Sequence, residues 1–267
     1  MRISIRHETR YDYAEPAAGV VMRLRMKPAS SSAQTVERWI ANGYGDGEAV
    51  WRAGSRVEGV TIVAEGDVRT FDVAGVLRLA DGAPRPQLFL RTTPLTQADA
   101  GIVALAERGR STRGPLSSLH TLKDIITEEV VWRAGITTSA TTAAEAFALK
   151  AGVCQDQSQI FIAAARCLGI PARYVTGYLE DPERPDDEHA SHAWAEAFVE
   201  GLGWIGFDCT LGRCPIDGHV RLACGLDAAD AAPIRGVMLP AGETKLSHDV
   251  QIAALPLDGP AQAQTQQ

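Results

Sequence analysis

The sequence lacks the marks of several classes of protein. It contains no run of about 18 apolar residues, so no transmembrane helix is predicted and no membrane partner is expected. Residues Met1 to His7 alternate between apolar and polar and do not form the apolar segment of a secretory signal, so we expect a cytoplasmic location. No Gly-x-x-x-x-Gly-Lys-Ser/Thr loop occurs, which argues against a nucleotide cofactor held by such a loop.

Cysteine and positive charge are also scarce. Five cysteines are an odd number and cannot close a disulfide framework, so at least one is expected to remain a free thiol. The net charge of −7 argues against a nucleic-acid partner, because phosphate binding needs a clustered basic surface. With 45% hydrophobic and 22% charged residues, the chain has an ordinary globular composition and can form one large domain or two smaller ones.

Residues 1–100 are rich in strand patterns. Alternating or β-branched stretches are separated by turn-forming pairs such as Asn42-Gly43 and Asp81-Gly82. These stretches are Arg2 to Arg6, Val20 to Met26, Val57 to Val63 and Thr70 to Leu79. Proline-containing segments between Ala83 and Leu95 then predict a boundary just before residue 100. We therefore expect an N-terminal antiparallel β domain over residues 1–100 that contributes no catalytic residue.

Beyond residue 100 the pattern changes to mixed helix and strand. Apolar residues at helical spacing predict helices, and apolar or alternating runs predict strands. We expect helices at 119–131, 142–149 and 154–168, and strands at 173–179, 192–199, 204–209 and 246–252. The prediction is an α+β catalytic domain over residues 101–255, followed over 256–267 by a disordered tail without an apolar period.

Cys154 follows Gly152 and Val153 and directly precedes a predicted helix. A helix N-terminus offers unpaired N–H groups and the positive end of the helix dipole, and both favour the thiolate, which is the nucleophilic form. The small Gly152 would let a substrate backbone approach closely. The alternative is that Cys154 is a small buried hydrophobic residue, which is the usual fate of a cysteine.

A histidine and an acid lie on the two strands of a predicted hairpin. His192 shares a strand face with Glu196, whereas the competing His189 lies in a polar loop where nothing would fix its ring. Asp208 ends an otherwise apolar strand, and burial of its charge would be unfavourable without a partner. Strict pairing across the turn sets Asp208 opposite Ala195, so we expect a β-bulge that brings Asp208 level with His192.

Four motifs in this order resemble the core of the bacterial transglutaminase-like superfamily over residues 119–212. They are Gly152-Val-Cys-Gln-Asp, Leu168-Gly-Ile-Pro-Ala-Arg-Tyr-Val-Thr-Gly-Tyr, His192-Ala-Trp-Ala-Glu and Gly203-Trp-Ile-Gly-Phe-Asp-Cys-Thr. Residues 228–236 and the β-rich start resemble further parts of the bacterial subfamily. In one departure, the family usually has Asp-Pro-Thr where this chain has Asp208-Cys209-Thr210.

The resemblance implies a papain-like α+β core with Cys154, His192 and Asp208 as a catalytic triad. His192 would take the thiol proton and later protonate the leaving amine, and Asp208 would hold the imidazole tautomer. The family's reaction is acyl transfer through a thioester, so we expect a peptide or amide substrate, no metal and no organic cofactor. The Cys154 N–H is a candidate oxyanion donor. Gln155 and Trp132 both remain open as the second donor.

Three classes of function fit these motifs. A peptidase or amidase is favoured over an amine acyltransferase, and a binding module without turnover is disfavoured because all three triad residues are present. The acidic loop over residues 180–188 is expected to lie beside the site entrance and to disfavour acidic substrates.

Two other groups of residues have simpler interpretations than catalysis. Glu196 could tune His192, but a buried ion pair with Arg173 is the plainer interpretation. A metal site is also conceivable, yet the spacing lacks the tight Cys-x₂-Cys pair of common zinc sites, so structural thiols are favoured. The residues concerned recur every five positions and are Cys209, Cys214, His219 and Cys224.

Overall fold

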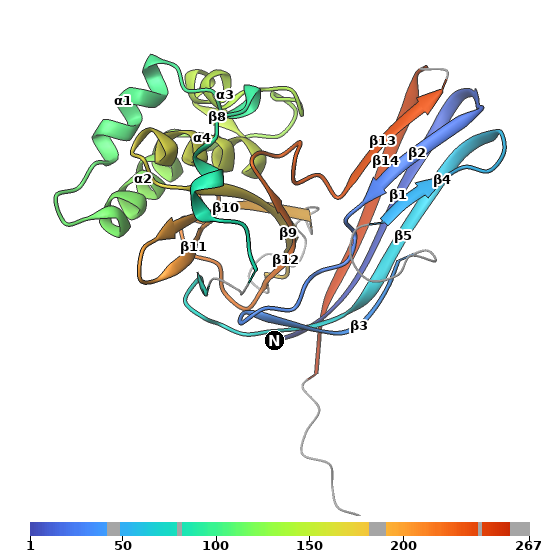
Figure 1. The fold of residues 1–267 in the computed structure, drawn as a ribbon, viewed down its shortest axis with the longest axis horizontal. Helices are drawn as coiled ribbons and strands as arrows, with labels where there is room; N and C mark the ends of the chain where they lie inside the picture. The colour runs from blue at the N-terminus through green and yellow to red at the C-terminus, as the bar shows by residue number, and fades with distance from the viewer. Residues whose placement is uncertain (42–48, 79–81, 182–190, 240–241, 257–267) are drawn as a thin grey trace, which may run out of the picture.

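The structure is a computed structural model that describes residues 1–41, 49–78, 82–181, 191–239 and 242–256. A body of helices around a sheet lies beside a body of long strands (Figure 1). No helix in these residues is both long and apolar enough to cross a membrane. Most of the predicted tail, from residue 257 onward, falls outside the described residues, as does His189.

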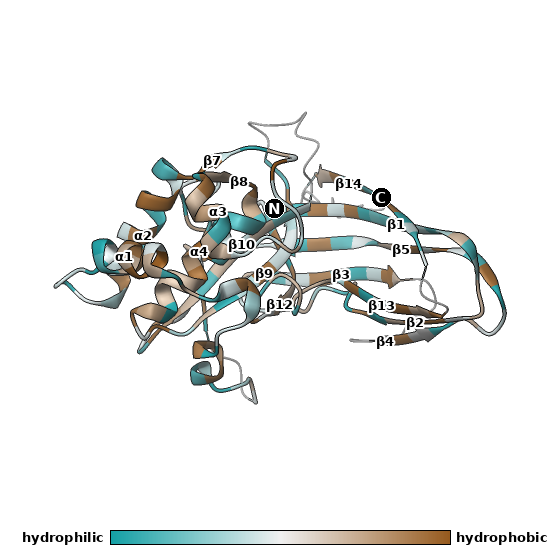
Figure 2. Ribbon diagram, turned by 90° about the horizontal axis from the view of Figure 1, so that it is seen from above, coloured by the Kyte–Doolittle hydropathy of each residue, from teal (hydrophilic) through white to brown (hydrophobic). Residues whose placement is uncertain are grey.

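The body of long strands has two layers. Its strands are β1 Arg2–Ala17, β2 Gly19–Leu24, β3 Gln34–Ala41, β4 Ala49–Arg52, β5 Val57–Thr70, β13 Ile234–Leu239 and β14 Thr244–Leu255. The larger sheet has the order β14-β1-β5-β3, and the smaller has the order β13-β2-β4. Figure 2 shows the two layers from above. Alternate residues such as Met22, Leu24 and Ile62 are buried in one apolar core between the layers.

The second body combines helices with a five-stranded antiparallel sheet. Its strands are β6 Val76–Leu77, β9 Ala172–Leu179, β10 Ser191–Val199, β11 Gly203–Phe207 and β12 His219–Gly225, in the order β12-β9-β10-β11-β6. The helices are α1 Ala100–Gly109, α2 Pro115–Glu129, α3 Ala143–Leu149 and α4 Cys154–Cys167, with 3₁₀ turns η1 Pro86–Leu90 and η2 Pro94–Thr96. A short parallel pair, β7 Val131–Trp132 and β8 Ala151–Gly152, precedes α4. The mixed α+β fold predicted from the sequence is confirmed.

Helix α4 is the centre of the second body. Every residue from Asp156 to Arg166 is buried, and the helix packs against α1, α2, α3 and the strands β9 and β10. The alanines of β10 at 193, 195 and 197 are buried in the same cluster as Ile160 and Phe161 of α4. Because alanine has a small side chain, the helix can lie close to the sheet. The first residue of α4, Cys154, is thereby held rigidly at one end of this packed helix.

The predicted domain boundaries do not match the sheets. β13 and β14, assigned from the sequence to the catalytic domain, pair with β2 and β1 of the strand body. β6, assigned to the N-terminal domain, pairs with β11. Periodicity identifies a strand but not its partner, so the pairing of Arg2 with Leu255 leaves no local signal in the sequence. Each body therefore contains segments from both sides of residue 100.

The two bodies share an apolar cluster. It consists of Ile3, Ile5 and Val68 from the strand body and Tyr178, Val220 and Leu222 from β9 and β12. His7 of β1 adds a polar contact, because its Nδ1 lies 2.9 Å from the Tyr178 hydroxyl. Burial lowers the pKa of His7 to about 4, so its ring is neutral. These contacts fix the strand body against the sheet that carries His192.

Candidate active site

Cys154 is the first residue of α4, and its side chain is half-buried. Asp156 holds this end of the helix, because its Oδ2 accepts from the Val153 N–H at 2.8 Å and from Thr137 Oγ1 at 2.7 Å. The first N–H groups of a helix have no acceptor within the helix, so the N–H of Cys154 is available beside its own sulfur. The helix N-terminus predicted around Cys154 is confirmed.

Gly152 has a packing role next to this helix end. It is buried, and a Cβ at this position would lie 2.7 Å from both Cβ and Oδ2 of Asp156. No larger residue fits unless Asp156 moves. The close packing of Asp156 therefore explains the glycine, rather than the approach of a substrate backbone that the sequence suggested.

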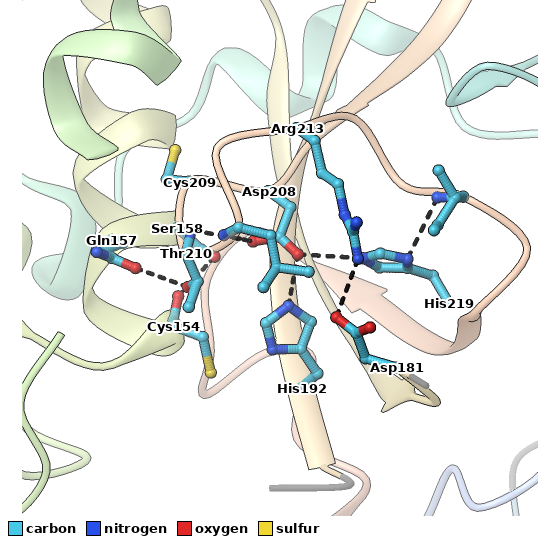
Figure 3. A network of polar contacts seen from close by, with 12 residues as sticks. Cys154, Gln157, Ser158, Asp181, His192, Asp208, Cys209, Thr210, Arg213 and His219 are labelled. Atoms are coloured by element: carbon cyan, nitrogen blue, oxygen red, sulfur yellow. Dashed lines mark hydrogen bonds and ion pairs between the residues drawn. The ribbon is translucent and has the colours of Figure 1, made fainter. Parts of the chain in front are cut away.

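His192 lies near the start of β10 and is only 7% exposed. Its Nε2 is 2.6 Å from Oδ2 of Asp208 (Figure 3). The other ring nitrogen, Nδ1, is on the side of the Cys154 sulfur (Figure 3). The structure therefore brings the three sequence-predicted residues together in the order sulfur, imidazole and carboxylate.

Asp208 reaches His192 without the predicted bulge. The ladder between β10 and β11 pairs Ala195 with Phe207 and Val199 with Gly203, with no shift in register. The hairpin loop thus spans residues 200–202, one residue fewer than the sequence suggested. Asp208 comes directly after β11, and its backbone exchanges two hydrogen bonds with Arg213, at 2.9 and 3.1 Å. From this turn its carboxylate extends to His192. The two residues lie diagonally across the neighbouring strands and not directly opposite each other.

Four donors surround the buried carboxylate of Asp208. Oδ2 receives His192 at 2.6 Å and Nε2 of His219 at 3.0 Å. Oδ1 accepts from the backbone N–H groups of Thr210 at 2.9 Å and Leu211 at 3.1 Å. The Thr210 hydroxyl in turn donates to Gln157 Oε1 at 2.6 Å, which ties this turn to α4.

The charges of Asp208 and His192 support each other. Burial alone would lower the pKa of His192, but the charge and hydrogen bond of Asp208, followed by those of Cys154, raise it to about 10. Burial alone would raise the pKa of Asp208, but His192 and the hydrogen bond from His219 hold it well below its usual range. At neutral pH the pair is an imidazolium and a carboxylate.

His219 was considered in the sequence only as a candidate metal ligand. Its Nδ1 accepts a hydrogen bond from the Ile216 N–H at 3.2 Å, so the proton is on Nε2 and is donated to Asp208. Burial is the main cause that lowers the pKa of His219, so this second ring is neutral. No pattern close to His219 in the sequence marks it as a partner of Asp208.

The metal hypothesis does not fit the contacts. Within the described ranges, the group of side chains close enough to share an ion consists of His192, Asp208 and His219, and it contains no cysteine. Both histidines direct a protonated Nε2 at one carboxylate oxygen, which is a hydrogen-bonded arrangement and not a ligand set. Cys209 is buried in the core beside α4.

Glu196 is occupied by arginines. Its Oε2 accepts from Arg173 Nε at 2.6 Å and its Oε1 from Arg221 Nε at 2.9 Å, and it is almost fully buried. The Arg173 guanidinium also lies 3.9 Å from the centre of the Trp204 ring. The interpretation of Glu196 as a buried partner of Arg173 is therefore confirmed.

A cleft of about 830 Å³ opens beside the sulfur and the imidazole. Trp132 and Gln155 both line it, so the choice of a second oxyanion donor stays open between them. Part of its wall comes from residues 248–250 of β14, which belongs to the strand body. In the predicted acidic loop, Asp181 accepts from Arg213 Nη2 at 3.1 Å, and residues 182–190 lie outside the described residues.

The sequence matches known families and several relatives. The model of the transglutaminase-like superfamily matches residues 103–209, and that of the bacterial transglutaminase-like N-terminal region matches residues 3–68. An uncharacterized protein of Mycobacterium tuberculosis is 31% identical over 152 residues, or 54% of this chain and 48% of that protein, so the chain spans about half the length of this relative. An uncharacterized protein of Mycobacterium leprae is 26% identical over 297 residues, which cover 95% of this chain and 99% of that protein.

A solved structure shares the whole fold. A protein of Cytophaga hutchinsonii, provisionally named a cysteine protease, aligns with a TM-score of 0.75 and 24% identity over 97% of this chain and 92% of its own. At this identity the likeness concerns the fold alone. Together with the two family matches, it covers both the strand body and the helical body. Residues 103–209 therefore match the core of the transglutaminase-like superfamily, and residues 3–68 match the bacterial N-terminal region that accompanies it.

Proposed function

We propose that the protein is a cysteine-dependent acyl-transfer enzyme that acts on amide or peptide bonds. Cys154 is the nucleophile, His192 its base and Asp208 the residue that orients His192. The observation that carries this proposal is a thiol at a helix N-terminus that lines the same cleft as an imidazole, whose far nitrogen is held 2.6 Å from a buried carboxylate. The match to the superfamily model supports the same assignment, because the matched residues include Cys154, His192 and Asp208.

The reaction follows from the positions of these atoms. In the reactive form the thiol proton of Cys154 already lies on Nδ1 of His192, which is therefore the imidazolium, and the sulfur attacks the carbonyl carbon of the amide. His192 then protonates the leaving nitrogen, the C–N bond breaks, and an amine departs from a thioester on Cys154. Water next gives a proton to His192 while its oxygen attacks the thioester carbon. The C–S bond breaks, a carboxylic acid leaves, and the sulfur and the protonated His192 return to their starting forms.

The negative oxygen of the tetrahedral intermediate needs donors close to the sulfur. The N–H of Cys154 lies at the first turn of α4, where the positive end of the helix dipole also favours negative charge. Trp132 and Gln155 are the candidates for the second donor because they line the same cleft. The chemistry needs no metal or organic cofactor, so activity is expected to persist in EDTA.

The first test is selective alkylation by iodoacetamide at neutral pH. Cys154 should react well ahead of the other four cysteines, since burial raises the pKa values of Cys167, Cys209 and Cys214. Mass spectrometry of the tryptic peptides measures each rate, and Cys154→Ser is the control. Equal or slower modification of Cys154 would overturn the proposal.

The second test asks which molecule resolves the thioester. A library of peptide and amide substrates, assayed with and without an added primary amine, separates hydrolysis from transfer to the amine. We expect release of the free acid to dominate, as in a peptidase or amidase. Predominant formation of the new amide would instead assign an amine acyltransferase. No turnover of any substrate, despite a reactive Cys154, would favour a binding module.

A further inference from the structure

The strand β14 is an unusually long edge strand. It has 12 residues, against about five or six for a typical strand, and it is the outermost strand of its sheet (Figure 2). One side of it pairs with β1 from Arg2 to Tyr13, and no strand of the described ranges pairs with its other side. Edge strands of this length present a row of backbone donors and acceptors to which another extended chain can bind.

The hydrogen bonds at the end of β14 reveal which residues face this free edge. The Ala14 N–H donates to the Glu243 carbonyl at 3.1 Å, directly beyond the pair of Tyr13 with Thr244 that ends the regular ladder between β1 and β14. Hydrogen-bonded and non-hydrogen-bonded pairs alternate along an antiparallel ladder. Along β14, every second residue counted from Glu243 belongs to a hydrogen-bonded pair, and this series includes Asp249. The backbone of Asp249 therefore forms hydrogen bonds with β1. His248 and Val250 consequently direct their N–H and C=O groups away from β1.

The hydrogen bonds on the opposite side of β1, with β5, lead to the same assignment of backbone directions. The Thr70 N–H donates to the Met1 carbonyl at 2.8 Å, so odd-numbered residues of β1 direct their backbone groups toward β5. Even-numbered residues must then direct theirs toward β14. Thr9 and His7, which pair with His248 and Val250, are odd-numbered. Both ends of the sheet thus place the backbone groups of His248 and Val250 on the free edge.

These two residues also line the cleft beside Cys154 and His192. The side chains of directly paired residues lie on the same face of a sheet, so His248 shares a face with the buried Thr9. The neighbouring His7 on that face contacts Tyr178 of the catalytic sheet. The free edge of β14 and the side chain of His248 therefore both border the space in which a substrate would reach the sulfur.

We propose that the backbone of His248 and Val250 binds the substrate as an added β-strand, so that the substrate is an extended polypeptide rather than a small amide. This inference rests on the proposed function and names the substrate class for the same site. Main-chain hydrogen bonds to the edge give affinity without regard to sequence, and the side chain of His248 contacts one substrate residue.

The experiment compares two alkylating probes on the full chain. One is iodoacetamide, and the other is a six-residue peptide of alternating threonine and alanine that carries an iodoacetyl group at one end; a second peptide carries it at the other end. Mass spectrometry gives the rate at which each probe modifies Cys154. We expect at least one peptide to react about tenfold faster than iodoacetamide, the gain that one or two net backbone hydrogen bonds provide.

Two variants test the backbone of Val250 directly. Val250→Pro removes the N–H that faces the free edge, and edge strands tolerate proline at such positions. The ratio of peptide rate to iodoacetamide rate should then fall toward one. Val250→Ala is the matched control, because it removes the side chain and keeps the N–H, so the ratio should be retained. Circular dichroism and the thermal midpoint show that each variant is folded.

A third arm needs no variant. Peptide probes with a single N-methylated amide at successive positions should lose their advantage at every second position, because alternate amides of an added strand face β14. The proposal is overturned if peptide and iodoacetamide modify Cys154 at the same rate, or if the effect of N-methylation has no two-residue period. It is also overturned if Val250→Pro changes only the mass measured by sedimentation. That result would show that the edge binds a second copy of the chain. The absolute iodoacetamide rate tests the proposed function separately, since the ratio is measured whatever that rate is.

Discussion

Asp208 is the residue on which the polar contacts of the candidate site converge. Two histidines share its Oδ2, and two backbone N–H groups bond to its Oδ1. Hydrogen bonds to a charged acceptor are stronger than neutral ones, and a buried carboxylate depends on them to stay ionised. Asp208 is thus held in place by its other three donors, and it in turn holds the ring of His192 and stabilises its charge.

Asp208→Asn should remove the effect of Asp208 on the ring and the charge of His192 while the fold is retained. The amide carries no charge, so burial is no longer offset and the pKa of His192 should fall from about 10 to 6.5 or below. We expect kcat/KM to fall roughly 10²–10⁴-fold, as for loss of the orienting acid in other triads. The ring titration is measured by NMR of His192. A ring that still titrates near 10 in the variant would contradict the assignment.

The same variant makes a prediction about stability and pH. The folded pKa of His192 lies above its ordinary value of 6.5, so the protonated ring stabilises the fold fully below pH 6.5 and loses this effect as the pH rises through about 10. Denaturant unfolding of the native protein should therefore show a loss of stability across this window. The loss should be smaller in Asp208→Asn, and an equal loss in both proteins would count against the pKa assignment.

His219 is expected to act as a positioning residue through Asp208. His219→Ala removes one of four donors to the carboxylate, so the pKa of Asp208 should rise and the acidic limb of the pH–rate profile should move upward. Loss of a charge-assisted hydrogen bond, worth about 1.5–3 kcal/mol, suggests a reduction in kcat of roughly tenfold or more. His219→Gln keeps a donor and should restore much of the rate. An unshifted profile in His219→Ala would assign a merely structural role.

Helix α4 is the element that determines where the sulfur lies. Gly152→Ala places a Cβ 2.7 Å from Asp156, whose carboxylate holds the helix end through Val153. We expect a loss of about 1–3 kcal/mol in the free energy of unfolding, as for overpacking, together with slower alkylation of Cys154. Gly54→Ala is the control because open space surrounds that exposed glycine. Equal effects of the two substitutions would show that the packing against Asp156 is unimportant.

At the scale of elements, local signals were sufficient for the core of the site. Helix α4 was predicted to within a residue because a glycine precedes it, an apolar face runs along it and Gly169 ends it. The contact of His192 with Asp208 followed from a hairpin, although the loop is one residue shorter than predicted because Gly203, at φ +103°, already pairs with Val199. The strand alternation and turn residues that define a hairpin are present in the sequence itself.

Contacts between distant elements were not predictable in this way. His219 reaches Asp208 only because β12 joins the far side of β9, and nothing near His219 in the sequence encodes that neighbour. Likewise, the strand predicted at 246–252 was placed within the catalytic domain, whereas β14 pairs with β1, because alternation specifies a face and not a partner. The part of the cleft wall that β14 forms was therefore not predicted either.

On the scale of the whole molecule, the strand body and the helical body are joined by three kinds of contact. Strands β13 and β14 return from the helical body to β2 and β1, β6 crosses in the other direction, and an apolar cluster fills the space between the bodies. Removal of residues 1–100 would leave β13 and β14 without partners. We therefore expect that the catalytic part does not fold by itself.

The shared cluster predicts that the two bodies unfold together. Ile5→Ala removes a fully buried side chain of β1 that packs against Tyr178 and Val220 of the catalytic sheet, which should lower the free energy of unfolding by about 2–5 kcal/mol. Cys209 is buried in the helical body, so the reaction of its thiol with a disulfide reagent reports unfolding of that body alone.

If the bodies form one cooperative unit, exposure of Cys209 in denaturant should shift to the same lower midpoint in Ile5→Ala as the circular dichroism of the whole chain. Ile40→Ala is the control, because this side chain of β3 is 58% exposed and its loss should leave both midpoints unchanged. An unshifted Cys209 midpoint in Ile5→Ala, alongside a shifted dichroism signal, would show that the catalytic body is stable without the strand body. In that case the cleft wall formed by β14 could move away from Cys154 while the catalytic body remains folded.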